Sequence, residues 1–173
     1  MIEEFLTKAR KVRLLLMDCD GVLTDGRLYF SESGEIMKAF HVRDGQGIVL
    51  WHKAGFLSAI ISGRSSEIVR VRANELGIKM LFQGVDKKLK VIERISAESK
   101  IGFDEMAFIG DDIGDVDAMK AVGFSACVAD AVRQVKSVAD FVTTKNGGEG
   151  AVREVIDFLL HAKGISYGEI KDS

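Results

Sequence analysis

The sequence predicts an α/β fold, a doubly wound parallel sheet of Rossmann-like type with helices on both faces. Two observations predict it. Short apolar runs alternate along the chain with amphipathic stretches of helical period, as in βα units. The first apolar run ends in an acidic, glycine-containing turn, DCDG at 18–21, and open parallel sheets hold ligands at the carboxyl ends of their strands. With 173 residues the chain fits one core, so we expect one domain over 1–173.

The strands are expected at short apolar runs that lie between turn residues. These runs cover residues 12–17, 57–61, 79–82, 106–109, 125–128 and 140–142. Helical periodicity fills the intervals, at 45–54, 65–76, 87–99, 114–121, 131–137 and 149–162.

A small β-hairpin insertion is expected at residues 27–40. RLYF and EIMKAF read as two short strands on either side of the turn SESG. The tail, residues 164–173, is polar, and we expect it to be flexible in an isolated subunit.

Composition argues against several classes of protein. The net charge is −2, so nothing global suggests a nucleic-acid partner. Cys19 and Cys127 are far apart in sequence, which argues against a disulfide framework and fits a reducing cytoplasm. No apolar run is long enough for a membrane helix, and the acidic residues near the start do not suit a secretory signal. We therefore expect a cytoplasmic protein with no membrane partner.

The strongest chemical signal is LLLMDCDGVLTDG, residues 14–26. Asp18 and Asp20 are separated by one residue at the end of a strand, where alternate side chains share a face. Both carboxylates can then point into one crevice. A strand followed by a plain acidic turn would give the same letters.

Later strands end in groups that suit a phosphate or a metal ion. If the strands are parallel, these groups reach the same sheet edge as Asp18. Taken singly, Ser62 could cap a helix, the lysines could be a solvated helix face, and the later acids could be helix caps. The groups are Ser62-Gly63-Arg64, then Lys87 and Lys88, then Gly110-Asp111-Asp112 with Asp115.

This order of motifs resembles the haloacid dehalogenase superfamily of phosphotransferases, over residues 12–145. The resemblance implies the fold of that superfamily and a covalent phosphoryl-transfer mechanism. Asp18 would be the nucleophile that forms an aspartyl-phosphate, and Asp20 the general acid and base. It also implies Mg²⁺, held by the Asp18 carboxylate, the Asp20 main-chain carbonyl and Asp111. Outer or alternate ligands would be Asp112 and Asp115, while the phosphate would be held by Ser62, the Gly63 amide and Lys88.

The intervals between motifs leave no room for a cap domain. Residues 25–62 hold only the hairpin and one helix, and the next two intervals are shorter. A monomer would therefore have an open site. Either the substrate is large, or a neighbouring subunit supplies the missing wall.

Further motifs closely resemble the 3-deoxy-D-manno-octulosonate 8-phosphate phosphatase family, from Arg13 to Leu160. They are DGVLTDGRLYF (20–30), KAFHVRDGQGI (38–48), QGVDKK (83–88) and GGEGAVREV (147–155). The family resemblance implies a phosphoric monoester hydrolase of lipopolysaccharide precursor biosynthesis. It also implies a homotetramer in which the 27–40 hairpins associate and adjoining subunits complete each site.

The same resemblance implies which residues contact the substrate. Arginines can pair with the substrate's carboxylate and phosphate groups in planar, bidentate fashion. His41 stands where relatives often have asparagine, and Val49 where some have arginine. Three alternatives stay open: an acylneuraminate (nonulosonate) 9-phosphate phosphatase, an open-site protein phosphatase and a non-catalytic module. The implied contacts are Asp20, His41, Val42, Arg43, Asp44, Gly45, Gly63, Arg64, Arg72 and Lys88.

Overall fold

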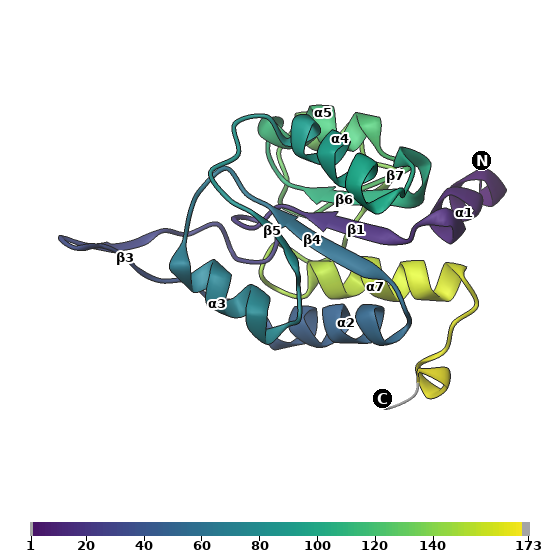
Figure 1. Ribbon diagram of the computed structural model, residues 1–173, viewed down its shortest axis with the longest axis horizontal. Coiled ribbons are helices and arrows are strands. Elements are labelled where there is room, and N and C mark those ends of the chain that lie inside the picture. The colour runs from purple at the N-terminus through teal and green to yellow at the C-terminus, as the bar shows by residue number, and fades with distance from the viewer. Residues whose placement is uncertain (1, 171–173) are drawn as a thin grey trace.

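A six-stranded parallel sheet forms the centre of the computed structural model, which describes residues 2–170 (Figure 1). The strand order is β5-β4-β1-β6-β7-β8. The chain leaves β1 toward one edge and later returns to its other side at β6, so the order reverses between these two strands. The predicted fold class is confirmed. The strands are β1 (Leu14–Met17), β4 (Leu57–Ile61), β5 (Met80–Phe82), β6 (Met106–Gly110), β7 (Phe124–Cys127) and β8 (Phe141–Val142).

Helices cover both faces of the sheet. In Figure 1, α2, α3 and α7 lie below it, and α4 and α5 lie above it. This division follows from right-handed crossovers on either side of β1. The helices are α1 (Ile2–Lys11), α2 (Val42–Lys53), α3 (Glu67–Glu75), α4 (Lys88–Ser99), α5 (Val116–Ala121), α6 (Arg133–Lys136) and α7 (Ala151–Ala162), with short 3₁₀ turns at Phe103–Glu105, Ile113–Asp115 and Tyr167–Glu169.

The core lies between the sheet and its helices. All four residues of β1 are fully buried, as expected for a central strand covered on both faces. Trp51 of α2 and Phe108 of β6 are among the largest buried side chains. Removing this apolar surface from water provides the main stabilisation of the fold. No helix among the described residues combines the length and the apolar composition that a membrane crossing requires.

Helix α1 is an element that the periodicity analysis did not predict. Its Phe5 packs against Phe124, Phe141 and Phe158, with ring centroids 5.4, 6.5 and 5.0 Å away. These partners come from β7, β8 and α7, so contacts distant in sequence stabilise a segment that is too short to be a stable helix alone.

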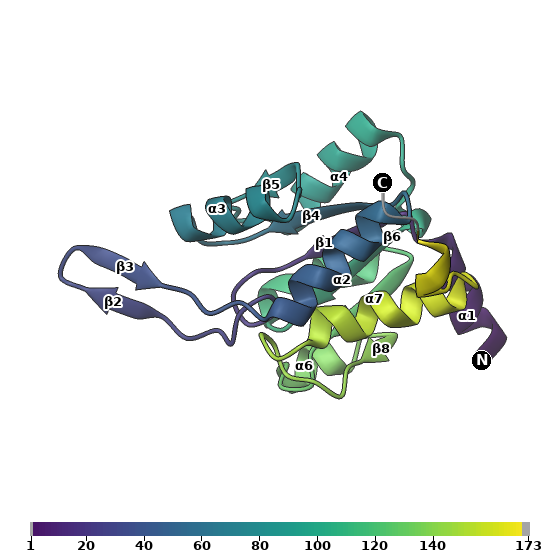
Figure 2. The same ribbon diagram turned by 90° about the horizontal axis from the view of Figure 1, so that it is seen from below.

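The predicted hairpin is present and projects from the body of the molecule (Figures 1 and 2). Strands β2 (Tyr29–Ser31) and β3 (Gly34–Met37) pair antiparallel. The second strand was expected to reach Phe40 but ends at Met37, because the next residue, Lys38, is buried against Asp20 in the turn after β1. Within residues 2–170 no cap domain is inserted, as expected.

Candidate active site

The first and fourth motifs meet where the strand order reverses. Strands β1 and β6 are neighbours in register, and the Asp18 amide donates to the Ile109 carbonyl at 3.0 Å. Asp18 and Asp111 therefore follow adjacent strand ends. One carboxylate oxygen from each of Asp18, Asp111 and Asp115 lies within 4.8 Å of the others. Three of the acids that the sequence placed at one edge of the sheet thus form a single cluster.

Crowding makes these carboxylates hard to ionise together. Burial raises the pKa of Asp111 to about 8, and the charges of Asp18 and Asp115 add to the effect. Burial likewise raises the pKa of Asp18, although the Lys88 ammonium opposes it. Oδ1 of Asp111 is buried without a hydrogen-bond partner among the described residues. Such an oxygen is costly unless a cation satisfies it. The cluster is therefore suited to Mg²⁺, which prefers hard oxygen ligands.

The turn after β1 must carry glycine at position 21. Its φ of +92° lies in the left-handed region that glycine tolerates best. A Cβ on Gly21 would also lie 2.1 Å from Oδ2 of Asp111. The side chain of Thr24 accepts hydrogen bonds from the Gly21 and Gly26 amides at 3.4 and 3.2 Å. Hydrogen bonds within the turn, made by the Thr24 side chain, thus hold Gly21 against Asp111 of the acidic cluster.

Lys88 supplies the positive charge of the site. Its Nζ lies 2.8 Å from Oδ1 of Asp18 and 2.6 Å from Oδ1 of Asp115. Burial alone would lower the pKa of Lys88, but the two carboxylates outweigh it and keep the pKa above its usual value. Lys88 is the first residue of α4, and its side chain extends from the start of that helix to the cluster. Lys88 is therefore a fixed ammonium beside Asp18.

Asp115 organises the loop after β6. It is almost fully buried, and its Oδ2 accepts hydrogen bonds from the Asp111 and Asp112 amides at 3.0 and 3.3 Å. Asp112 instead caps the following 3₁₀ turn through the Ile113 amide, at 2.7 Å. The capping interpretation is confirmed for Asp112. The Asp115 side chain makes no cap hydrogen bond to α5, bonds back to the Asp111 and Asp112 amides instead, and belongs to the cluster.

An open, polar cavity of about 290 Å³ joins the motifs. Ser62, which follows β4, is buried in its wall, and its Oγ accepts from the Arg64 amide at 3.3 Å. Nε of Arg64 lies 3.6 Å from Oδ2 of Asp20. The cavity is large enough for a phosphate group with part of its substituent. Its walls are formed by Asp18, Asp20, Ser62, Gly63, Arg64, Val85, Asp86, Lys88, Asp111, Asp112, Gly114 and Asp115.

The other expected substrate contacts do not line this cavity. His41 caps α2, where its Nδ1 accepts from the Arg43 amide at 3.2 Å. Val42 is largely exposed, and Arg43 borders a separate surface cavity beside α7. Arg72 pairs with Glu75 at 2.8 Å and lies over the Phe40 ring. Within one chain, the structure therefore separates these residues from the phosphate cavity.

Asp44 caps a helix within this chain. It is buried, and its carboxylate accepts hydrogen bonds from the Gly150 and Arg153 amides at 3.3 and 2.8 Å. These amides lie at the start of α7, where carboxylates are favourable caps. The carboxylate expected to contact substrate is therefore engaged by main-chain amides within this chain. Gly45 lies beneath Arg72, where a Cβ would lie 2.3 Å from the guanidinium.

Comparisons with known proteins identify the family. The profile of the haloacid dehalogenase-like hydrolases matches residues 52–156. The 3-deoxy-D-manno-octulosonate 8-phosphate phosphatase KdsC of Salmonella typhi is 45% identical over 159 residues, 92% of this chain and 85% of that protein. The chain belongs to the 3-deoxy-D-manno-octulosonate 8-phosphate phosphatase family of haloacid dehalogenase-like hydrolases.

Solved structures of this phosphatase family share the fold. The enzyme from Moraxella catarrhalis, in complex with magnesium ion, phosphate ion and KDO, has a TM-score of 0.92 and 40% identity over 95% of this chain and 94% of that one. The cobalt-bound enzyme from Haemophilus influenzae has a TM-score of 0.89 and 41% identity, covering 91% and 92%.

Residues of the hairpin were missed as part of this phosphatase site. Lys38 is buried and its Nζ lies 2.5 Å from Oδ1 of Asp20, while Glu35 lies beside both. A lysine and a glutamate in a predicted hairpin read as ordinary surface charges. The only sequence signal was their spacing of three residues, which is common on exposed segments.

Proposed function

We propose that this protein is a Mg²⁺-dependent phosphatase that hydrolyses 3-deoxy-D-manno-octulosonate 8-phosphate to the free sugar acid and phosphate. One observation carries the proposal: Asp18, Asp111 and Asp115 form one carboxylate cluster, with the Lys88 ammonium against Asp18 and Asp115, at the wall of a cavity that Asp20 also lines. A carboxylate next to a fixed ammonium and a suitable cation site is the arrangement needed by a phosphoryl-accepting nucleophile. The substrate is inferred from the name of relatives such as the Salmonella enzyme, which is 45% identical to this chain.

The reaction has two steps that use the same two acids. A carboxylate oxygen of Asp18 attacks phosphorus, and the bond from phosphorus to the sugar oxygen breaks. Asp20 gives its proton to that departing oxygen. Asp20 then takes a proton from water, the water oxygen attacks phosphorus, and the bond to Asp18 breaks. Phosphate leaves, and both side chains return to their starting states.

The remaining groups offset the electrostatic repulsion between the carboxylates and a phosphate dianion. The Asp18 and Asp111 carboxylates and the Asp20 main-chain carbonyl would hold Mg²⁺, which would neutralise charge on the phosphate. Lys88 holds Asp18 in place and lines the cavity, where it would face the phosphate, and Ser62 with the Gly63 amide would bind the phosphate oxygens. Asp115 fixes the loop that presents Asp111.

Association of several chains would bring the expected substrate contacts that lie outside the cavity next to a reaction site. We propose a homotetramer in which the 27–40 hairpins associate, so that His41, Val42, Arg43 or Arg72 borders a neighbouring subunit's cavity. The hairpin exposes Phe30 and Ile36 by 55% and 59%, and exposed apolar clusters mark interaction surfaces. An arginine at that border would pair with the sugar carboxylate. We place this activity in the cytoplasm, in lipopolysaccharide precursor biosynthesis.

A substrate panel tests the proposal. Phosphate release is measured with Mg²⁺ on 3-deoxy-D-manno-octulosonate 8-phosphate, an acylneuraminate 9-phosphate, glucose 6-phosphate and a phosphoserine peptide. The octulosonate should have the highest kcat/KM. A preference for the nine-carbon acid or the peptide would overturn the substrate assignment. Asp18→Asn should lower kcat at least ~10⁴-fold with the fold retained, whereas Asp25→Asn, in the same turn, should stay close to wild type. Retained activity in Asp18→Asn would reject the nucleophile.

A further inference from the structure

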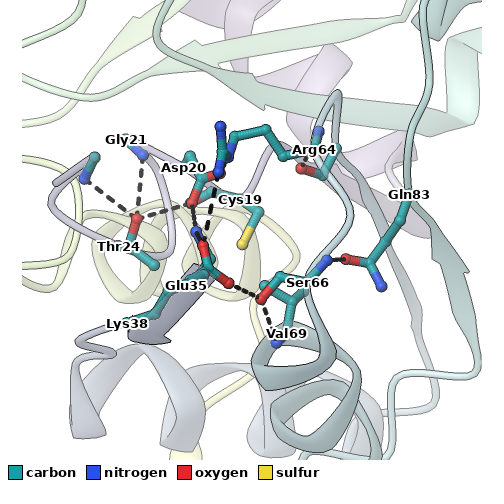
Figure 3. A network of polar contacts seen from close by, with 12 residues as sticks. Cys19, Asp20, Gly21, Thr24, Glu35, Lys38, Arg64, Ser66, Val69 and Gln83 are labelled. Carbon is teal, nitrogen blue, oxygen red and sulfur yellow. Dashed lines mark hydrogen bonds and ion pairs between the residues drawn. The ribbon is translucent and has the colours of Figure 1, made fainter. Parts of the chain in front are cut away.

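A buried lysine links the base of the hairpin to Asp20. Lys38 follows β3, and its side chain is only 1% exposed. Its Nζ lies 2.5 Å from Oδ1 of Asp20 and 3.0 Å from Oε1 of Glu35 (Figure 3). A lysine is rarely so buried unless it is paired, and Lys38 has two carboxylate partners. The residue that follows β3 therefore directs its side chain to two specific carboxylates, Asp20 and Glu35.

Glu35 anchors this lysine to the body of the protein. The Ser66 hydroxyl donates to Oε2 of Glu35. Ser66 is itself the N-cap of α3, where its Oγ accepts from the Val69 amide at 3.4 Å. Its own amide donates to Oε1 of Gln83 at 2.8 Å. Figure 3 shows the chain of contacts from Gln83 through Ser66 and Glu35 to Lys38. The position of Nζ is thus set by α3 as well as by the hairpin.

Each oxygen of Asp20 faces a different cation. Lys38 lies at Oδ1, and Nε of Arg64 lies 3.6 Å from Oδ2. Lys38 is buried whereas the Arg64 side chain is 43% exposed, so the two contacts are unequal. The buried contact holds the Asp20 side chain in one orientation, because one carboxylate oxygen is paired with an ammonium that is itself buried and held by Glu35. The other oxygen stays on the open side, in the wall of the cavity.

We propose that Lys38 is a positioning residue that holds Asp20 with one carboxylate oxygen turned toward the sugar oxygen of the bound phosphate. General acid catalysis needs the acid within hydrogen-bond reach of the atom it protonates, and small misplacements of catalytic groups slow reactions strongly. Glu35 and Ser66 support Lys38 in this role. The proposal rests on the proposed phosphatase function, since it assigns Asp20 the proton transfer. It also implies that catalysis depends on the position of the hairpin, because Lys38 at the hairpin base must reach Asp20.

The first test compares Lys38→Met with Lys38→Arg. Lys38→Met keeps the apolar stem but removes the ammonium. With a sugar phosphate, its kcat should fall by ~10- to 100-fold, and KM should change little because Lys38 does not line the cavity. The initial burst of p-nitrophenolate from p-nitrophenyl phosphate should be nearly unchanged, because that leaving group needs no proton. Lys38→Arg should recover part of kcat. Lys79→Met, an exposed lysine far from the site, is the control.

A double-mutant cycle with Asp20→Asn separates positioning from a merely structural role. If Lys38 acts through Asp20, adding Lys38→Met to Asp20→Asn should lower kcat little further. Fully additive losses, or an equal loss of the p-nitrophenolate burst, would overturn the proposal. Should Lys38→Met not fold, Glu35→Gln replaces it in the same cycle with the same criterion.

The cycle can be measured on any aliphatic phosphate that the wild type hydrolyses. Failure of the octulosonate assignment in the substrate panel would leave this measurement intact. Failure of the positioning role would show as additivity while the panel still favours the octulosonate.

Discussion

Nζ of Lys88 lies 2.8 Å from Oδ1 of Asp18, so the proposed nucleophile is already engaged by a buried cation before a phosphate arrives. The same ammonium lies 2.6 Å from Asp115, which holds the loop that presents Asp111. Lys88 therefore connects the nucleophile with the loop that carries the proposed metal ligand.

Replacing Lys88 should destabilise the protein as well as inactivate it. Lys88→Met leaves Asp18 and Asp115 buried without their cation, and breaking such a pair destabilises by about 3 kcal/mol or more. Urea unfolding in EDTA should show this loss, and phosphate release should fall below ~1% of wild type. Lys87→Met, at the exposed neighbouring position, should change neither quantity greatly. Equal effects of the two substitutions would contradict the special place of Lys88.

Metal-free protein should become less stable as pH rises. The pKa of Asp111 is raised from 3.8 to about 8 in the folded protein. The folded state therefore holds a proton that the unfolded state releases, so stability is lost as pH rises from about 4 to about 8. Thermal melting in EDTA should show Tm falling across this window, and Asp111→Asn should flatten the slope. An unchanged slope in Asp111→Asn would rule out this carboxylate as the cause.

Mg²⁺ should reverse that loss. The ion binds ionised carboxylates, so its stabilisation should be larger near pH 8 than near pH 5. At saturating Mg²⁺, a gain of ~1–2 kcal/mol would raise Tm by about 2–8 °C in a domain of this size. Asp111→Asn should lose most of the gain, while Asp104→Asn, on an exposed 3₁₀ turn, should keep it. An equal Tm with and without Mg²⁺ at pH 8 would contradict the proposed metal site.

The loop before α7 should be intolerant of an added methyl group. A Cβ on Gly147 would lie 1.7 Å from the main-chain oxygen of Gly21. The Gly21 carbonyl can move away only by displacing the turn that carries Asp20. We expect Gly147→Ala to destabilise by about 1–3 kcal/mol and to lower kcat. Gly168→Ala, where a Cβ meets nothing within 4 Å, is the matched control. Wild-type stability and activity in Gly147→Ala would show that this contact is not needed.

Polar substitutions on the hairpin should disrupt the proposed assembly. Phe30→Ser combined with Ile36→Ser removes two apolar side chains that are more than half exposed on the hairpin. Analytical ultracentrifugation should show a shift from tetramer to smaller species, with lower activity on the sugar phosphate. Val142→Ser, an exposed apolar position on the edge strand β8, should leave the mass unchanged. A monomeric wild type would refute the tetramer, and an unchanged mass in the double variant would exclude the hairpin from the interface.

Local sequence patterns were sufficient for most of the fold and for the centre of the site. Apolar runs predicted the strands, because strands buried on both faces need continuous apolar sequence. Asp18 and Asp111 could be placed together because the ends of neighbouring parallel strands share one edge of the sheet. Helix α1 was missed since its stability depends on aromatic partners from β7, β8 and α7.

The sequence by itself determined the α/β class, the hairpin and the group of acids at the strand ends, because these follow from periodicity and from groups adjacent in the chain. Only the tertiary structure decided what single charged residues do. Asp44 turned out to cap α7, and Lys38 to lie buried against Asp20. Neither role has a local signature, since a buried charge is defined by the partners that folding brings to it from distant parts of the chain.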